Sequence, residues 1–300
     1  MENPNTVYGG ALELLPYAMR APFSEVPEDE KENAEEIRLR IGRRASLLLP
    51  DGEKEIVGAP VSARDLECVF EIASRASVHS VSGSIANGYV TAPGGYRVGF
   101  CGTAALSDGK MTGFRSISSA AVRIPHEIKG AADGIMKELF SDGIKSVLIV
   151  SSPGAGKTTL LRDALRQLSD SGVRVSAADE RGELAAVCAG VPQMDVGEKT
   201  DVLDACPKAQ AVMLLLRCLN PQVIAMDEIT SPEDVAAINS AAGCGVRLLA
   251  TAHAESLEDL RARPVYKRLL KAGIFDSAVF ITKKPGGARK YECIPLKREG

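Results

Sequence analysis

The segment Lys145–Leu161 reads KSVLIVSSPGAGKTTLL and determines how the rest of the chain is interpreted. It begins with the apolar, β-branched run Val147–Val150, which is short enough to be a buried parallel strand. A turn rich in proline and glycine follows, and Gly156-Lys157-Thr158-Thr159 then opens a helix. A strand, a glycine-rich turn and a helix in this order predict a phosphate-binding loop, because small residues let backbone N–H groups surround phosphate oxygens.

The residues of this loop have expected roles in binding ATP and Mg²⁺. Lys157 would reach the β- and γ-phosphates, and the Thr158 hydroxyl would ligate Mg²⁺. Ser151 stands where the pattern G-x-x-x-x-G-K-[ST] has its first glycine. An ordinary turn with a surface lysine is the alternative, and the strand and helix on either side count against it. The residues expected to bind the nucleotide are Pro153, Gly154, Ala155, Gly156, Lys157, Thr158 and Thr159.

The composition is that of an ordinary globular protein, long enough for two domains. The chain has 300 residues, of which 25% are charged and 45% hydrophobic. Its formal net charge of −3 argues against a strong electrostatic footprint for nucleic acid. No apolar run approaches the roughly 18–20 residues that cross a bilayer. The opening Met1-Glu-Asn-Pro lacks the basic and apolar parts of a secretory signal, so we expect a cytoplasmic protein.

Seven cysteines are scattered along the chain without a C-x-x-C pair. An odd number at irregular spacing is typical of neither a disulfide framework nor a zinc site. We expect them to be buried free thiols in a reducing compartment.

The first part of the chain, residues 1–125, is expected to form a small α+β domain. Glu36–Ile41 alternates apolar and polar residues, which predicts a half-buried strand. Asp51-Gly52 signals a turn between strands at Ala45–Leu49 and Glu55–Val57. Ser62 is placed to cap a helix. Further strands are expected at Gly88–Ala92, Tyr96–Cys101 and Ala120–Ile124.

The second part of the chain has a different pattern. Residues 126–144 are expected to be a linker with a helix at Ala131–Phe140, and residues 145–300 to form the second domain. From Lys145 onward strands alternate with helices, which predicts an α/β fold with a parallel, helix-covered sheet. After the phosphate-binding loop, strands are expected at Val173–Ala178, Val223–Met226 and Arg247–Thr251.

Acidic residues follow the strands of this second domain. Asp227 and Glu228 come directly after Val223–Met226, in the arrangement of a Walker B motif. Asp227 would hold Mg²⁺, and Glu228 would orient or activate the attacking water. Glu180 and Glu183 follow the preceding strand, where either could support Mg²⁺ or water. The alternative for this pair is a solvated acidic turn.

A histidine and several arginines are further candidates. His253 follows the strand Arg247–Thr251, where its imidazole could contact a γ-phosphate. The pattern shows no positively charged residue that would face the phosphate-binding loop within one subunit. Phosphoryl transfer is faster when an arginine of the same or a neighbouring subunit contacts the phosphate. Candidates are Arg97, Arg115 and Arg123 of the first domain, although each could also be a surface or structural arginine.

The loop, the acidic segment, the Walker B strand and the histidine occur in an order that resembles the secretion-ATPase superfamily of RecA-like motors. These motors serve type II and type IV secretion and pilus assembly. Leu215-Leu216-Arg217, Asn220-Pro221 and Asp227-Glu228-Ile229 look like that superfamily's Walker B block, and Thr251-Ala-His253 looks like its His box. The resemblance implies a RecA-like P-loop NTPase core. Thr230 stands where many members carry an arginine, which puts more weight on the first-domain arginines.

A closer resemblance, to the stage III sporulation protein AA family, covers nearly the whole chain. It implies an ATPase that works as a hexameric ring and energises a secretion-like channel from the mother cell to the forespore. Its partners would be membrane-embedded channel proteins, and it would lie in the cytoplasm at the inner face of the membrane. The segments that carry the resemblance are Ala34–Arg40, Pro93–Gly99, Asp179–Arg181, Gly190–Gln193 and Asp195–Lys208.

Two other functions stay open at this point. A nucleic-acid-dependent NTPase would use Arg38, Arg40, Arg43 and Arg44 as a basic track, although only 4% of the residues are aromatic and able to stack bases. A nucleotide-binding scaffold without turnover is the other alternative, and Ser151 motivates it.

Overall fold

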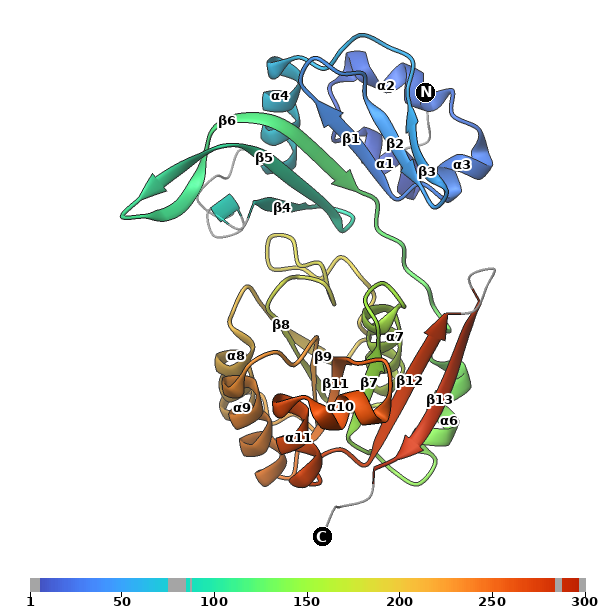
Figure 1. Ribbon diagram of the computed structural model, residues 1–300, viewed down its shortest axis with the longest axis vertical. Coiled ribbons are helices and arrows are strands. Elements are labelled where there is room, and N and C mark those ends of the chain that lie inside the picture. The colour runs from blue at the N-terminus through green and yellow to red at the C-terminus, as the bar shows by residue number, and fades with distance from the viewer. Residues whose placement is uncertain (1–5, 75–84, 87, 284–287, 297–300) are drawn as a thin grey trace. The chain divides into compact units, whose positions relative to one another are not determined.

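The structure is a computed structural model that describes residues 6–74, 85, 86, 88–283 and 288–296. It divides into two compact units (Figure 1). Unit 1 comprises residues 1–126 and 186–193, and unit 2 comprises residues 127–185 and 194–300. The opening residues, on which the expectation of no secretory signal depends, lie outside the described part of the chain.

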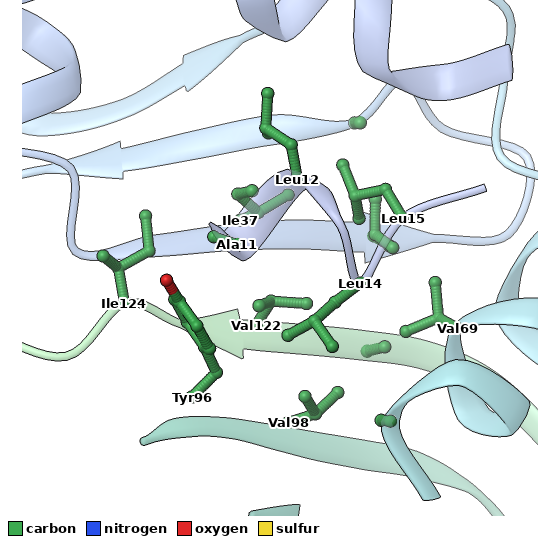
Figure 2. Packing of buried hydrophobic residues seen from close by; sticks show 14 of the residues in the cluster. Ala11, Leu12, Leu14, Leu15, Ile37, Val69, Tyr96, Val98, Val122 and Ile124 are labelled. Carbon is green, nitrogen blue, oxygen red and sulfur yellow. The ribbon is translucent and has the colours of Figure 1, made fainter. Parts of the chain in front are cut away.

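Unit 1 is built on a six-stranded antiparallel sheet in the order β3-β2-β1-β6-β5-β4. Side chains alternate between the two faces of a strand, and Ile37 and Leu39 of β1 are fully buried on one face. Helices cover that face, where Leu12 and Val69 join Ile37 and Val122 in one apolar cluster (Figure 2). The strands are β1 (Glu36–Arg40), β2 (Ser46–Leu49), β3 (Gly52–Glu55), β4 (Tyr89–Ala92), β5 (Tyr96–Ser107) and β6 (Lys110–Arg123). The helices are α1 (Val7–Leu12), α2 (Tyr17–Ser24), α3 (Glu28–Glu32) and α4 (Ala63–Ser74).

Most local predictions for unit 1 agree with the structure. The Ser62 hydroxyl accepts the Asp65 backbone N–H at 3.2 Å and so caps α4 as predicted. The strand β3 begins at Gly52, earlier than predicted, because Leu49 pairs directly with Gly52 across a tight turn. The strands β5 and β6 continue well beyond the predicted segments to the turn at Asp108-Gly109. The large apolar residues of this extension, Leu106, Met111, Phe114 and Ile117, do not alternate with period two, so the sequence pattern did not indicate it.

Unit 2 is built on a seven-stranded sheet in the order β13-β12-β7-β11-β10-β8-β9. Its strands pair in parallel, except that β13 is antiparallel to β12. Helices α8, α9 and α11 cover one face of the sheet, and α7 lies on the other (Figure 1). The strands are β7 (Val147–Ser151), β8 (Val175–Asp179), β9 (Thr200–Asp204), β10 (Val223–Met226), β11 (Arg247–His253), β12 (Ser277–Lys283) and β13 (Arg289–Pro295). The helices are α6 (Asp133–Phe140), α7 (Lys157–Asp170), α8 (Lys208–Cys218), α9 (Pro232–Gly243), α10 (Leu257–Ala262) and α11 (Pro264–Lys271).

The register of the parallel strands brings their carboxyl ends to one edge of the sheet. Ser151 at the end of β7 pairs with His253 at the end of β11. Met226 at the end of β10 pairs with Ala250 on one side and Ala178 on the other. The residues that follow these strands are therefore neighbours, as ligand-binding residues of open α/β sheets are.

The seven cysteines are free, but none of them is buried. Cys101, Cys218 and Cys244 are exposed, and the other four are partly exposed. The expectation of buried thiols is therefore wrong. The three exposed cysteines lie on the extended β5–β6 hairpin (Cys101) and at the ends of α8 (Cys218) and α9 (Cys244). In the described part of the chain, no helix is both long and apolar enough to span a membrane.

Candidate functional site

The phosphate-binding loop runs from the end of β7 to the start of α7. Gly154 and Gly156 have φ values of 72° and 101°, in the left-handed region where a side chain would be strained. Ser151, which replaces the first glycine of the pattern, is the last residue of β7 and keeps strand geometry. Its hydroxyl donates to the Ser152 carbonyl at 2.9 Å. A residue with a side chain therefore fits at this position.

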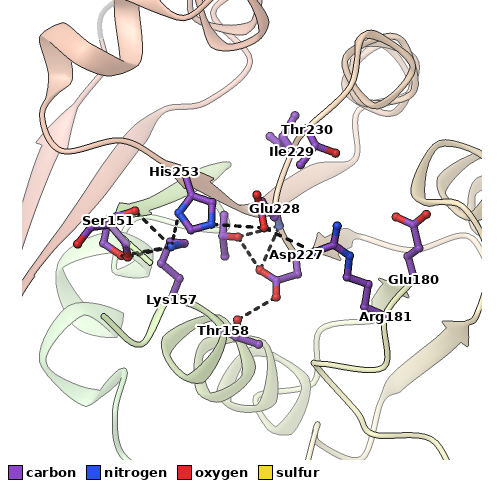
Figure 3. Close-up of polar contacts among 12 residues, drawn as sticks. Ser151, Lys157, Thr158, Glu180, Arg181, Asp227, Glu228, Ile229, Thr230 and His253 are labelled. Carbon is purple, nitrogen blue, oxygen red and sulfur yellow. Dashed lines mark hydrogen bonds and ion pairs between the residues drawn. The ribbon is translucent and has the colours of Figure 1, made fainter. Parts of the chain in front are cut away.

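Lys157 is the first residue of α7, and the residue is only 7% exposed. Its ammonium donates to the carbonyls of Ser151 and Ser152, both at 3.2 Å, and lies 2.9 Å from Nδ1 of His253 (Figure 3). Burial lowers the pKa of Lys157, while the negative charges of Asp227 and Glu228 oppose this shift. The ammonium thus rests on loop carbonyls and is available to a more strongly charged acceptor.

Asp227 is held by two hydroxyl groups. Thr158 Oγ1 donates to its carboxylate at 2.8 Å, and Thr251 Oγ1 donates at 2.6 Å. The predicted Mg²⁺ ligands Thr158 and Asp227 are therefore adjacent (Figure 3). Among the described residues no three His, Cys, Asp or Glu side chains form a metal-binding group. One carboxylate and one hydroxyl fit Mg²⁺, which is commonly held by few protein ligands together with water and nucleotide phosphates.

Glu228 has a left-handed backbone, with φ of 37°. Its N–H donates to Thr251 Oγ1 at 2.7 Å, and its carbonyl accepts from Lys208 Nζ at 2.6 Å. Its carboxylate lies 3.4 Å from Nε2 of His253 and 4.0 Å from Nη1 of Arg181. A non-glycine residue in this region costs about 1–3 kcal/mol and persists only where its surroundings hold it.

His253 connects the lysine of the loop to the acid after β10. One ring nitrogen faces Lys157 and the other faces Glu228, so the imidazole lies between the two (Figure 3). Its backbone N–H donates to the Tyr266 hydroxyl at 3.3 Å, and that hydroxyl donates to the Ile229 carbonyl at 2.9 Å. The position of His253 is therefore tied to the segment that follows Glu228.

The acidic segment after β8 contains one residue that sequence reasoning missed. Asp179 is 1% exposed and accepts backbone N–H groups of Glu183, Leu184 and Ala185 at 2.8, 3.0 and 2.8 Å. Burial raises the pKa of Asp179, although these N–H groups act in the opposite direction. The carboxylate of Asp179 therefore fixes the backbone of the loop that contains the predicted residues Glu180 and Glu183. Because every residue of β8 is buried, the alternation of its side chains gave no signal of this inward direction.

Glu180 and Glu183 lie beside Asp227 and Glu228, the acids that follow β10. They share a pocket with Arg181, Lys208 and Glu228, among other residues. The Glu180 carboxylate lies 3.5 Å from Lys208 Nζ. The two predicted acids are therefore brought to the candidate site, where Glu180 faces a buried lysine.

The three arginines predicted as candidates all belong to unit 1. Arg97 of β5 and Arg123 of β6 are paired across the two strands, whereas Arg115 lies farther along β6. The Arg97 guanidinium stacks 3.8 Å from the centre of the Tyr89 ring. Their role at a phosphate stays a prediction.

Unit 2 itself supplies a cation that the sequence did not reveal. Arg289, at the start of β13, donates from Nε to the Ala155 carbonyl at 3.0 Å. A Cβ added to Gly156 would lie only 2.9 Å from that Nε, so the guanidinium lies directly against the loop. No local pattern could have indicated this contact, because it depends on β12 pairing with β7 and on β13 turning back beside it.

Comparisons with known proteins agree with this architecture. Residues 11–292 match the family model described as "Sporulation stage III, protein AA". The chain is 36% identical over 280 residues to stage III sporulation protein AA of Bacillus subtilis (strain 168), covering 91% of each protein. It is 26% identical over 300 residues to Protein SEEDLING PLASTID DEVELOPMENT 1 of Arabidopsis thaliana, covering 99% of this chain and 40% of that protein.

Two solved structures show the same fold at low sequence identity. The Legionella pneumophila ATPase DotB aligns with a TM-score of 0.58 and 17% identity, over 89% of this chain and 78% of that one. The pilus retraction motor PilT with bound ADP aligns with a TM-score of 0.58 and 16% identity, over 90% of this chain and 82% of that one. The predicted fold class, a RecA-like P-loop core preceded by a smaller α+β part, is confirmed.

Proposed function

The chain belongs to the family of sporulation stage III protein AA, and we propose that it is a Mg²⁺-dependent ATPase of the secretion-motor type. In this proposal, a ring of subunits, hexameric by the resemblance, hydrolyses ATP to energise the assembly of a sporulation channel or transport through it. The ring would bind membrane-embedded channel proteins at the inner face of the membrane, on the mother-cell side.

The observation that carries the proposal is the hydrogen bond of 2.8 Å between Thr158 and Asp227. It joins the first turn of the helix after the phosphate-binding loop to the acid after β10. A nucleotide-binding site needs these two oxygen ligands on the same side of the loop. An ordinary glycine-proline turn with a surface lysine would require neither this contact nor a buried Lys157.

The residues of unit 2 suggest how hydrolysis would proceed. Loop N–H groups would bind the phosphates, and Lys157 would leave the carbonyls of Ser151 and Ser152 for the β- and γ-phosphates. When bound, Mg²⁺ neutralises charge that develops on the phosphate oxygens, and Thr158 and Asp227 would hold it. Glu228 would orient the attacking water and accept its proton.

Other residues would support this reaction from the edges of the site. His253, between Lys157 and Glu228, would contact the γ-phosphate, and Glu180 would help to hold water beside Glu228. Arg115 and Arg123, with Arg97 as a further candidate, would supply positive charge to the site of a neighbouring subunit. Arg289 would add a cation on the same subunit, against the loop at Ala155 and Gly156.

The basic track required by a nucleic-acid-dependent NTPase is largely paired with acids. Arg38 lies 2.8 Å from the Glu36 carboxylate, and Arg44 lies 3.3 Å from the Glu55 carboxylate. Arg40 forms an ion pair with Glu53. Because these pairs reduce the charge offered to phosphates, the surface favours a motor over a nucleic-acid enzyme.

Phosphate release by the wild type and two variants tests the proposal. We expect Glu228→Gln to bind Mg²⁺-ATP but to release phosphate at least about 100-fold more slowly, since a general base contributes on that order. Lys157→Ala is expected to lose nucleotide binding. Glu228→Gln that releases phosphate at the wild-type rate would contradict the assignment, and a wild type that retains ATP without turnover would favour the scaffold.

The ring is tested separately by measuring particle mass with and without Mg²⁺-ATP. A shift from monomer to a larger ring on nucleotide addition supports the motor. A protein that stays monomeric under all conditions contradicts it.

A further inference from the structure

Lys208 is a buried cation beside the candidate site that the proposed reaction does not use. It is the first residue of α8, and only 6% of its side chain is exposed. A buried ammonium is costly unless charged or polar partners surround it. Its partners are the Glu228 carbonyl at 2.6 Å, the Glu180 carboxylate at 3.5 Å and the Asp234 carboxylate at 3.9 Å.

The shortest of these contacts is to the main chain of Glu228 and not to its carboxylate. Glu228 has φ of 37°, a conformation that glutamate rarely adopts without support. Thr251 holds the amide side of this residue by accepting its N–H at 2.7 Å. Lys208 holds the carbonyl side. The strained residue is thus fixed at both of its peptide groups.

The segment after Glu228 is fixed by the same group of residues. The Asp234 carboxylate accepts the backbone N–H groups of Thr230 and Ser231, both at 3.0 Å. Lys208 lies beside this carboxylate as well as beside the Glu228 carbonyl. One ammonium therefore links the start and the end of the turn between β10 and α9.

We propose that Lys208 is a positioning residue that holds Glu228 in the left-handed conformation from which its carboxylate reaches the attacking water. This inference rests on the proposed ATPase function. Without the bond from Lys208, residue 228 relaxes toward an ordinary backbone conformation. Its carboxylate then turns away from His253, while Lys157, Thr158 and Asp227 still bind the nucleotide.

The test uses the full-length Lys208→Met variant, which keeps the length of the side chain and removes its charge. We expect kcat for ATP hydrolysis to fall about 10- to 100-fold, as when a catalytic group is misplaced by about 1 Å. The Kd of ATP should change less than about 3-fold, because no phosphate contact is lost. Lys31→Met is the matched control, since Lys31 is also a buried, ion-paired lysine but lies in unit 1; it should retain wild-type kcat.

A double-mutant cycle separates positioning from a merely structural role. If Lys208 acts through Glu228, adding Lys208→Met to Glu228→Gln should slow phosphate release by less than about 2-fold further. Independent effects that multiply would overturn the inference. Lys208→Arg, which keeps the charge, should restore part of the lost kcat.

Crystal structures of the variants give a result that does not depend on turnover. Residue 228 should leave positive φ in Lys208→Met, and an unchanged φ would overturn the inference even if the wild type proved not to hydrolyse ATP. An inactive wild type would itself count against the proposed function, so the two failures are distinguishable. If Lys208→Met does not fold, Lys208→Arg serves as the test. A Lys208→Arg variant that has wild-type kcat, although its arginine does not donate to the Glu228 carbonyl, would also overturn the inference.

Discussion

Asp179 and Asp227 occupy equivalent positions on neighbouring parallel strands. Ala178 of β8 pairs with Met226 of β10, and each aspartate comes directly after its member of this pair. Asp179 accepts three backbone N–H groups of the loop that follows it. Asp227 instead accepts two side-chain hydroxyls, from Thr158 and Thr251, and one backbone N–H, that of Glu228 at 3.0 Å, which also donates to Thr251.

The different donors indicate that Asp179 is a structural carboxylate, whereas Asp227 is able to bind a cation. Backbone N–H groups of a folded loop have no other acceptor once buried, so Asp179 cannot leave them without a large cost. Hydroxyls can rotate and donate elsewhere, so the carboxylate of Asp227 can exchange them for a cation. Two aspartates at the same register therefore have different expected effects when mutated.

The strongest test of this contrast is Asp227→Asn. We expect ATP hydrolysis to fall at least about 100-fold, the size typical for removing one electrostatic group from an active site. Stability should change by less than about 1 kcal/mol, because the asparagine oxygen accepts one of the two hydroxyls, which donate to different oxygens of Asp227, and the other hydroxyl can rotate to accept from the NH₂ group. Phosphate release and urea denaturation of the same preparation measure the two quantities. If Asp227→Asn lost stability but kept ATP hydrolysis, Asp227 would be a structural carboxylate and the contrast with Asp179 would be wrong.

Asp179→Asn should have the converse effect. An asparagine has one carbonyl oxygen for the N–H groups of Glu183, Leu184 and Ala185, and its NH₂ group opposes at least one of them. An unsatisfied buried donor costs about 1–3 kcal/mol, which we expect as the loss in the free energy of unfolding. The urea midpoint should fall with an unchanged m value. Equal stability of Asp179→Asn and wild type would show that these N–H groups find other acceptors.

Much of the candidate site was predictable because parallel strands bring their ends together. Lys157, Asp227 and His253 each come after an apolar strand segment. The pairing of β7 with β11 and of β11 with β10 brings these three residues close together. Local patterns were therefore enough to select these residues. Their catalytic roles stay predictions.

The residues that sequence reasoning did not find depend on long-range topology or on side-chain direction. Arg289 reaches the loop only because β12 adds beside β7 and β13 turns back along it. In β13 the alternation is limited to Tyr291 and Cys293 between exposed charged residues, which is a weak signal for a strand. Lys208 ends the segment Asp195–Lys208, which from sequence alone could face a subunit boundary, a central pore or solvent, and the structure shows that Lys208 is buried. Asp179 was passed over for Glu180 because a run of acids does not show which carboxylate faces the interior.

Glu53 on β3 of unit 1 extends the comparison to a carboxylate held at the surface by a charge. It accepts hydrogen bonds from the Arg40 guanidinium and the Ser46 hydroxyl. The bond from Arg40, with a smaller contribution from Ser46, lowers the pKa of Glu53 to about 2, whereas burial raises the pKa of Asp179. The two carboxylates therefore contribute to stability with opposite dependence on pH: that of Asp179 is lost as the pH rises, and that of Glu53 as the pH falls.

We expect Glu53→Gln to destabilise unit 1 near neutral pH and to lose this effect in acid. Because the folded pKa lies below the ordinary value of 4.5, the ionised carboxylate stabilises the fold above that value, and the contribution is lost as the pH falls through about 2. Arg40 and Glu53 side chains are 42% and 37% exposed, so screening by water keeps the effect below about 1 kcal/mol. The difference in urea midpoint between variant and wild type should be largest near neutral pH, shrink as the pH falls below about 4.5 and vanish below about 2. If the difference in urea midpoint does not change with pH, hydrogen bonding rather than charge holds Glu53. Glu53 would then be a structural carboxylate like Asp179.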